Sequence, residues 1–169
     1  MYEVYDLILK RRTLFNAFLL LNAILLGLGT GFCQMQSLGR SETFAAAKLS
    51  PGEVREVIAV IAKLAYDTPD SWRKELRVRR VDLGATPGLV AQGTNLLCGG
   101  TGNCQVFVLH KENKKWISLF DSDAPVGEGF RFGPGAANGI KDFTIATNSS
   151  AEAAQRVTYK FDGHFYRIK

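Results

Sequence analysis

Residues 104–120 read CQVFVLHKENKKWISLF, and this stretch decides the fold. Two runs rich in β-branched and aromatic residues, 104–110 and 115–120, flank a four-residue connection, which predicts an antiparallel hairpin. In the first run, Val106 and Val108 alternate with Phe107 and Leu109, so both faces of the strand are apolar. We therefore expect this hairpin at the centre of a sheet that is covered on both sides.

A second hairpin is predicted near the end of the chain. Residues 155–168 read QRVTYKFDGHFYRI, with the favoured two-residue turn Asp162-Gly163 between two strands. A turn of this length fixes the register and pairs Phe161 with His164. One face of the pair is then mostly apolar and the other mostly polar, as expected for strands that are half buried.

An amphipathic helix is predicted to follow Ser50. Ser50 can cap its first turn, Pro51 suits the first helical position, and Glu53 can complete a capping box. Pro69 is expected to end the helix by Asp67. Apolar residues recur on one face, which needs a sheet to pack on: Val54, Val57, Ile58, Ile61, Leu64 and Ala65.

The cysteines predict a disulfide. Cys98 and Cys104 flank a glycine-rich turn, CGGTGNC, whose glycines permit a tight path in an oxidising compartment. A disulfide that closes such a short loop stabilises the folded state by about 2–3 kcal/mol in the loop-entropy model. The alternative is a nucleophilic Cys104 with His110 as its base, which requires a thiol that stays reduced outside the cell.

The first 33 residues predict a targeting segment. Basic residues at 10–12 precede an apolar run at 14–32, in the order of an export signal. Small residues before Gln34 permit cleavage there. The run is also about long enough to span a bilayer, so a retained membrane anchor stays open. The expected location is periplasmic or secreted, or membrane-anchored with the domain outside the cytoplasm.

The remainder has the length of one domain. Residues 34–47 show no sustained period and are predicted to be a tether, and residues 48–169 to be a single α+β domain. The net charge is +5, and the charges are shared evenly between the halves of the mature chain, so no basic half indicates nucleic-acid binding. Membrane contact is expected only through the N-terminal segment.

Two groups of residues are candidates for binding. Residues 124–140, APVGEGFRFGPGAANGI, place five glycines around Phe130, Arg131 and Phe132, which predicts a mobile loop that presents aromatic and cationic side chains. A run of cations lies in and beside a predicted strand, where it indicates either a charged sheet edge or an anion contact: Arg73, Lys74, Arg77, Arg79 and Arg80. Of these, Arg77 and Arg79 are the binding candidates.

The sequence predicts no catalytic residue, no cofactor and no metal. His110 and His164 are more than fifty positions apart in separate hairpins, which does not fit the ligand spacing of a zinc site. The glycine-rich turn lacks the Lys-Ser or Lys-Thr of a phosphate-binding loop, and no Gly-x-Ser-x-Gly is present. The alternative function is an exported hydrolase that uses Cys104, or a histidine with an aspartate such as Asp121.

The turn at 98–104, the Val-Phe-Val strand that follows and the sequence YKFDGHFY at 159–166 resemble a group of small exported bacterial proteins of unknown function. Their cores have a Cys-Gly-rich-Asn-Cys turn and a closing Phe-Asp-Gly-x-x-Tyr hairpin. The resemblance covers about residues 72–169. It implies a fold and an exported location, and no catalytic residues.

The predicted fold class is α+β: one N-terminal amphipathic helix packed on an antiparallel, hairpin-rich sheet of about five to seven strands, with one disulfide. Shorter strands are expected at 88–92 and 143–147. The predicted function is an exported, non-enzymatic binding module whose partner is an unknown protein, glycan or envelope component, for example in a protective or inhibitory role.

Overall fold

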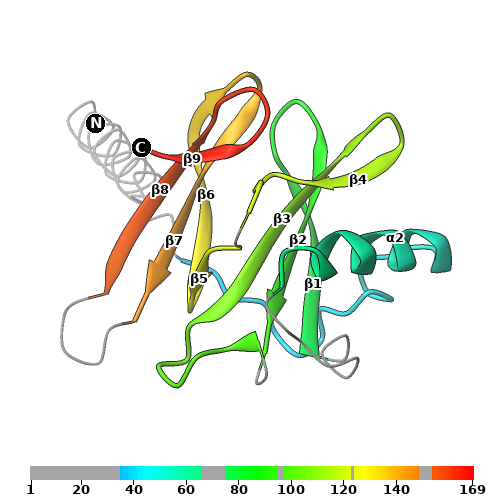
Figure 1. Ribbon diagram of the computed structural model, residues 1–169, viewed down its shortest axis with the longest axis horizontal. Coiled ribbons are helices and arrows are strands. Elements are labelled where there is room, and N and C mark those ends of the chain that lie inside the picture. The colour runs from blue at the N-terminus through cyan, green and yellow to red at the C-terminus, as the bar shows by residue number, and fades with distance from the viewer. Residues whose placement is uncertain (1–34, 66–74, 95–96, 123, 149–153) are drawn as a thin grey trace, which may run out of the picture. The chain divides into compact units, whose positions relative to one another are not determined.

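The structure is a computed structural model that describes residues 35–65, 75–94, 97–122, 124–148 and 154–169 (Figure 1). By its contacts, the chain divides into Met1–Cys33 and Gln34–Lys169. The first unit, which holds the predicted signal peptide or anchor, lies outside the described residues. Within the described residues, no helix is both long and apolar enough to cross a membrane.

The described part of the second unit contains one helix and nine strands. These are α2 (Pro51–Ala62), β1 (Leu76–Asp82), β2 (Pro87–Gly93), β3 (Cys104–Glu112), β4 (Lys115–Ser118), β5 (Val126–Gly127), β6 (Gly129–Ala137), β7 (Ile140–Thr147), β8 (Gln155–Phe161) and β9 (Tyr166–Ile168).

The strands form two antiparallel sheets. The first has the order β1-β2-β3-β4, with β5 paired to the start of β3, and the second has the order β6-β7-β8-β9. The prediction of an antiparallel, hairpin-rich α+β fold with one helix is confirmed. The strands divide between two sheets instead of one, a partition that strand periodicity alone does not encode.

Strand β3 lies between two hydrophobic cores. Val106 and Val108 belong to the core shared with the second sheet, and Phe107 and Leu109 belong to the core shared with α2. All four side chains are fully buried. The prediction of a central strand covered on both faces is therefore confirmed.

Helix α2 begins with the predicted capping box. Glu53 N–H donates to Ser50 Oγ at 3.2 Å, and Ser50 N–H donates to the Glu53 carboxylate at 2.9 Å. The helix is not N-terminal, because described residues 35–50 precede it. It also ends earlier than predicted, at Ala62, since Leu64 N–H bonds Ile61 O three residues back, a pattern that tightens the last turn of a helix.

The segment 35–47, predicted to be a tether, lies along both sheets. Gln36 exchanges two backbone hydrogen bonds of 2.7 Å with Phe130 of β6, and Val78 N–H of β1 donates to Glu42 O at 2.8 Å. Leu38 joins the core between the sheets. Because the segment pairs with the sheets at isolated points, its sequence has no period that would reveal the packing.

The last hairpin differs from the predicted register. Phe161 pairs with Tyr166 instead of His164, so the loop has four residues. The Asp162 carboxylate accepts the backbone N–H groups of His164 and Phe165 at 2.8 and 2.7 Å, which stabilises the longer loop. The shift is two residues, so the predicted faces are kept.

The glycine-rich segment 124–140 is not a loop. It forms β5, β6, the turn at Asn138-Gly139 and the first residue of β7. The glycine at 127 permits close packing, because a Cβ there would lie 2.4 Å from Ala146 O. Phe130 and Phe132 consequently pack on the core between the sheets.

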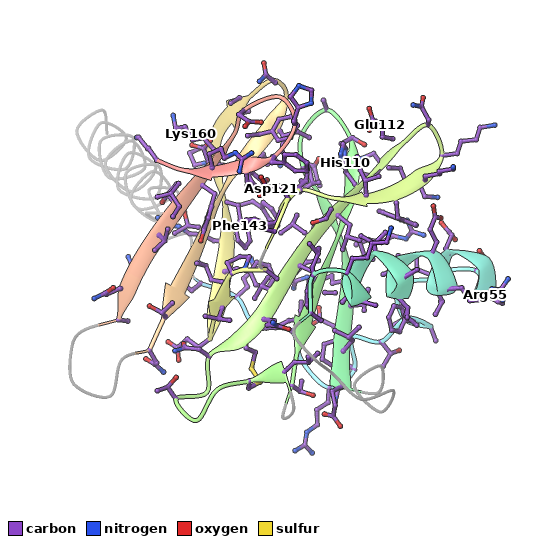
Figure 2. The ribbon with its side chains drawn as sticks, viewed as in Figure 1. Arg55, His110, Glu112, Asp121, Phe143 and Lys160 are labelled. Carbon is purple, nitrogen blue, oxygen red and sulfur yellow. A yellow bond between two sulfur atoms is a disulfide. The ribbon has the colours of Figure 1, made fainter. Side chains whose placement is uncertain are left out.

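Cys98 and Cys104 form the predicted disulfide, which is visible as a yellow bond near the start of β3 (Figure 2). The backbones of the two cysteines also form an isolated antiparallel β-bridge. Within the turn, Gly99 N–H donates to Asn103 O at 2.7 Å. The disulfide therefore closes a turn that is already hydrogen-bonded.

Candidate binding groove

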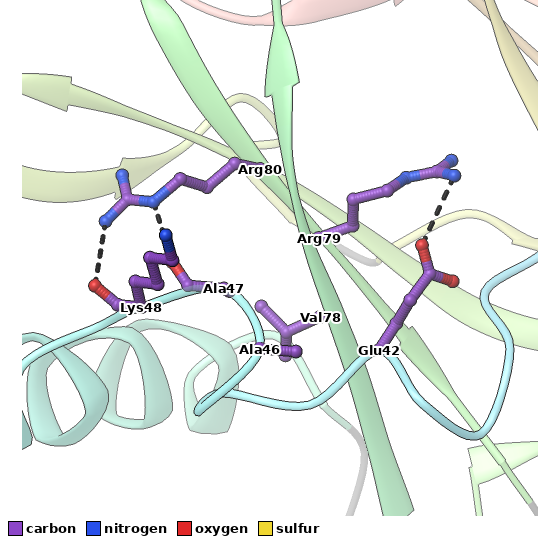
Figure 3. A pocket seen from close by; sticks show the side chains of 7 residues that line it. All are labelled: Glu42, Ala46, Ala47, Lys48, Val78, Arg79 and Arg80. Atoms are coloured by element: carbon purple, nitrogen blue, oxygen red, sulfur yellow. Dashed lines mark hydrogen bonds and ion pairs between the residues drawn. The ribbon is translucent and has the colours of Figure 1, made fainter.

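A groove of about 330 Å³ lies between β1 and the segment at 42–48 (Figure 3). This volume is at the lower end of the range for small-ligand sites. Three cations and one carboxylate give the groove a positive character. Its lining residues are Glu42, Ala46, Ala47, Lys48, Val78, Arg79 and Arg80.

The middle of the groove is apolar and its two ends are charged. Figure 3 shows Val78 and Ala46 between Arg80 with Lys48 on one side and Arg79 with Glu42 on the other. Val78 is 1% exposed and belongs to the core beneath α2, so the groove lies over the well-packed first sheet.

Arg80 is held over the groove by backbone carbonyls. Its Nε donates to Ala47 O at 2.8 Å and its Nη2 to Lys48 O at 3.4 Å. Carbonyl oxygens orient a guanidinium but do not neutralise it. Of the ion pairs found among the described residues, none involves Arg80 or Lys48, so no carboxylate in that part of the chain neutralises either cation.

Lys48 has an unusual backbone conformation. Its φ is +52°, and it follows a helical turn in which Ala47 N–H donates to Thr43 O at 2.9 Å. This left-handed position commonly holds glycine at the end of a helical turn, and other residues pay about 1–2 kcal/mol there. The chain thus places an ammonium beside Arg80 at a conformational cost.

Arg79 is bound more completely. Its Nη1 lies 3.3 Å from Glu42 Oε1, its Nη2 donates to Gln36 Oε1 at 2.6 Å, and its guanidinium carbon lies 5.7 Å from the ring centre of Phe130. These contacts compensate its charge and fix its position. Arg79 therefore forms part of the wall of the groove. Arg80 and Lys48 form its rim, the exposed part that a ligand can reach.

Of the five residues predicted for binding, only Arg79 lines this groove. Arg77 is half buried and donates to Leu76 O at 3.4 Å. Phe130 is fully buried, Phe132 packs on it with ring centres 6.2 Å apart, and Arg131 lies between them in sequence on the opposite face of β6. The structure does not bring these residues together into one surface.

Lys48 was not predicted, and Arg80 was predicted only as one of the strand cations that indicate a charged edge or an anion contact. The signal for Arg80 is the pair Arg79-Arg80, which places a cation on each face of β1 and so interrupts the alternation of the strand. Lys48 carries no such signal, because its position depends on a turn that the sequence does not mark with glycine.

Two other hollows are less suited to a ligand. One, of about 530 Å³, lies beside the disulfide, where Gln92 already bonds Leu38 N–H at 2.8 Å and Glu128 O at 3.4 Å. The other, of about 490 Å³, lies between α2 and β4 and includes Asp121, which is ion-paired with Arg167. In both, the polar groups named here already have protein partners.

The residues of the alternative catalytic hypothesis each contact a different part of the protein and do not form one site. Cys104 is in a disulfide and offers no thiol. Burial lowers the pKa of His110, whose ring lies 6.5 Å from that of Phe161, so its neutral form is favoured. The pKa of Asp121 is lowered by its hydrogen bond to Arg167, 2.6 Å away. Among the described residues, no three His, Cys, Asp or Glu side chains gather as a metal site.

Comparison with models of protein families, with curated proteins and with solved structures gave no match for this chain.

Proposed function

We propose that this chain is an exported, non-enzymatic binding module for a protein, a glycan or another component of the cell envelope. The observation that carries the proposal is the groove beside β1, where Arg80 and Lys48 lie beside apolar residues and have no ion pair among the described residues. A binding site needs such convergent, unsatisfied groups in a shaped hollow. Catalysis needs in addition an activated nucleophile or a matched acid and base.

The state of the cysteines supports a binding role. With Cys104 joined to Cys98, the hydrolase alternative lacks its thiol, and with Asp121 bound to Arg167, the carboxylate is committed to an ion pair. A disulfide in a small domain is also typical of exported proteins. This supports our proposal that the protein acts in the periplasm or outside the cell, either released by cleavage before Gln34 or retained on an N-terminal anchor.

The location is tested by a thiol count on protein isolated from the cell fractions. We expect the protein in the periplasmic, secreted or membrane fraction, with Cys98 and Cys104 unreactive toward a thiol reagent until they are reduced. N-terminal sequencing then distinguishes a chain that begins at Gln34 from one that keeps its anchor. Recovery from the cytosol with both thiols free would contradict an exported module.

The binding role is tested by capture from an envelope extract. The immobilised wild type is compared with the double variant Lys48→Gln/Arg80→Gln and with the matched control Lys114→Gln/Lys115→Gln, which removes two exposed cations from the β3–β4 hairpin. We expect one or more components that the wild type and the control retain and the first variant loses. Equal retention by all three proteins, or none by any, contradicts the proposal.

A further inference from the structure

We infer that the groove beside β1 binds a carboxylate group that is joined to a short apolar body. This inference rests on the proposed function and names the chemistry of the group that its groove recognises. Three features of the groove support it: the free donors of Arg80, the second cation at Lys48, and the apolar residues between the charged ends.

The guanidinium of Arg80 has donors left for a ligand. An arginine carries five N–H donors in a rigid planar fork, and the contacts to Ala47 O and Lys48 O use two of them. The side chain is exposed, so the remaining donors are accessible. A planar fork matches the two oxygens of a carboxylate in a bidentate pair.

The backbone of Arg80 adds another donor. Strand β1 pairs with β2 in an antiparallel ladder, in which alternate residues direct their N–H groups away from the partner strand. Val78 is one of these, because its N–H donates to Glu42 O. Arg80 is the next, so its N–H points to the side of β1 on which the groove lies.

The lining favours a carboxylate over a phosphate ester. Phosphate sites are typically built from clustered backbone N–H groups at a helix N-terminus or glycine-rich loop. Here the carbonyl oxygens of Ala47 and Lys48 lie beside Arg80, and the carboxylate of Glu42 lies beside Arg79 at the other end of the groove. These oxygens repel a dianion more strongly than a monoanion. The exposed Ala46 supplies apolar surface for the body of the ligand, and the buried Val78 lies beneath it.

The test is an NMR titration of the isolated chain with butyrate. Butyramide has the same shape without the charge, and methyl phosphate offers a dianion with little apolar body. We expect saturable shifts of the amide signals of Lys48, Val78 and Arg80 with a dissociation constant of about 1–10 mM, the range open to so small a ligand. Butyramide and methyl phosphate should bind at least about tenfold more weakly.

Two variants and a control assign the effect to the rim. Arg80→Gln removes the charged fork and should weaken butyrate binding about tenfold or more. Lys48→Gly removes the second cation while suiting the positive φ of this position, and should weaken binding severalfold in a protein that remains folded. Lys114→Gln, in the β3–β4 turn, should leave the affinity unchanged.

The carboxylate inference is overturned if butyramide or methyl phosphate binds as well as butyrate, or if Arg80→Gln leaves the butyrate affinity unchanged. Should Arg80→Gln fail to fold, the affinity of Lys48→Gly decides. Failure of the titration with envelope capture still dependent on Lys48 and Arg80 rejects the carboxylate and leaves the binding role intact. Specific butyrate binding without any envelope partner rejects the proposed role instead.

Discussion

Asn103 and Asn148 exchange two hydrogen bonds although they lie 45 positions apart. Asn103 Nδ2 donates to Asn148 O at 2.7 Å, and Asn148 N–H donates to Asn103 Oδ1 at 2.8 Å. A side-chain amide can do both because it carries a donor and an acceptor. The bonds join the disulfide-closed turn of the first sheet to the end of β7 in the second, which gives the asparagine of the Cys-Gly-rich-Asn-Cys turn a structural role.

Replacement of Asn103 by alanine should lower the free energy of unfolding by about 1–2 kcal/mol, since it removes both bonds. Asn103→Asp keeps the acceptor for Asn148 N–H and loses the donor, so its loss should be intermediate. Thr101→Ala removes only the acceptor of a 2.8 Å bond from the same amide and should cost less than Asn103→Ala. Urea denaturation of the four proteins measures the order, and equal losses in all three variants would contradict the assigned role.

The glycines of segment 124–140 were interpreted from the sequence as signs of mobility. In the structure they mark places where strands approach closely, as at Gly127, and a favoured turn at Asn138-Gly139, with φ of 49° and 78°, that joins β6 to β7. The Asn-Gly pair was the local signal for this hairpin. Glycine content alone cannot distinguish a flexible loop from tight packing, because both need a residue without Cβ.

Gly127→Ala should therefore destabilise the protein, by about 1–3 kcal/mol or more. The added Cβ would lie 2.4 Å from Ala146 O and 2.5 Å from the Ile145 side chain, which forces strands apart. Gly100→Ala is the matched control, because a Cβ there meets nothing within 4 Å, and its effect should stay within about 0.5 kcal/mol. Thermal denaturation compares the two, and equal midpoints would support a loose loop at 127.

The central hairpin shows which part of a turn the sequence determines. Its two strands and their buried faces were predicted, but the connection was taken as four residues. The structure pairs Glu112 with Lys115 and leaves only Asn113-Lys114, with φ of 48° and 68°, in the turn. This is the conformation of a type I′ turn, whose second residue is usually glycine. Because Lys114 stands at that position, the sequence does not show the usual signal of a two-residue turn.

Lys114→Gly should consequently raise the free energy of unfolding by about 0.5–1 kcal/mol, because glycine adopts the positive φ without steric cost. The neighbouring change Lys115→Gly lies in β4, where glycine should lower it by about 0.5–1 kcal/mol. Two identical substitutions one residue apart are thus expected to act in opposite directions. Urea denaturation checks this, and a loss of stability in Lys114→Gly would refute the turn assignment.

Only part of the groove could be predicted from the sequence. Cations on β1 were predicted, but a groove needs two walls, and its second wall comes from residues 42–48, whose packing is irregular. Lys48 enters the site through a positive φ that no residue pattern announces. Local periodicity predicts which face of a strand is buried, whereas the pairing of a strand with an irregular segment depends on tertiary contacts.

Glu53 connects the start of α2 to the central hairpin, and this connection should depend on pH. Its Oε1 accepts from Lys111 Nζ at 2.7 Å and its Oε2 from Ser50 N–H at 2.9 Å. These bonds, that to Lys111 first, lower the pKa of Glu53 from 4.5 to about 2. Because the folded pKa is below the unfolded one, the stabilisation is complete above about pH 4.5 and is lost as the pH falls toward 2.

Glu53→Gln should accordingly be less stable than the wild type at pH 7, with a difference that shrinks between pH 4.5 and pH 2 as the wild-type carboxylate is protonated. Lys111→Gln removes the largest cause of the pKa shift and should narrow the same pH dependence while leaving the bond to Ser50 in place. Thermal denaturation across this pH range measures both effects. Parallel stability curves for the wild type and Glu53→Gln would show that the carboxylate has the same pKa in the folded and unfolded chain, and the proposed link between α2 and the hairpin would then have no electrostatic part.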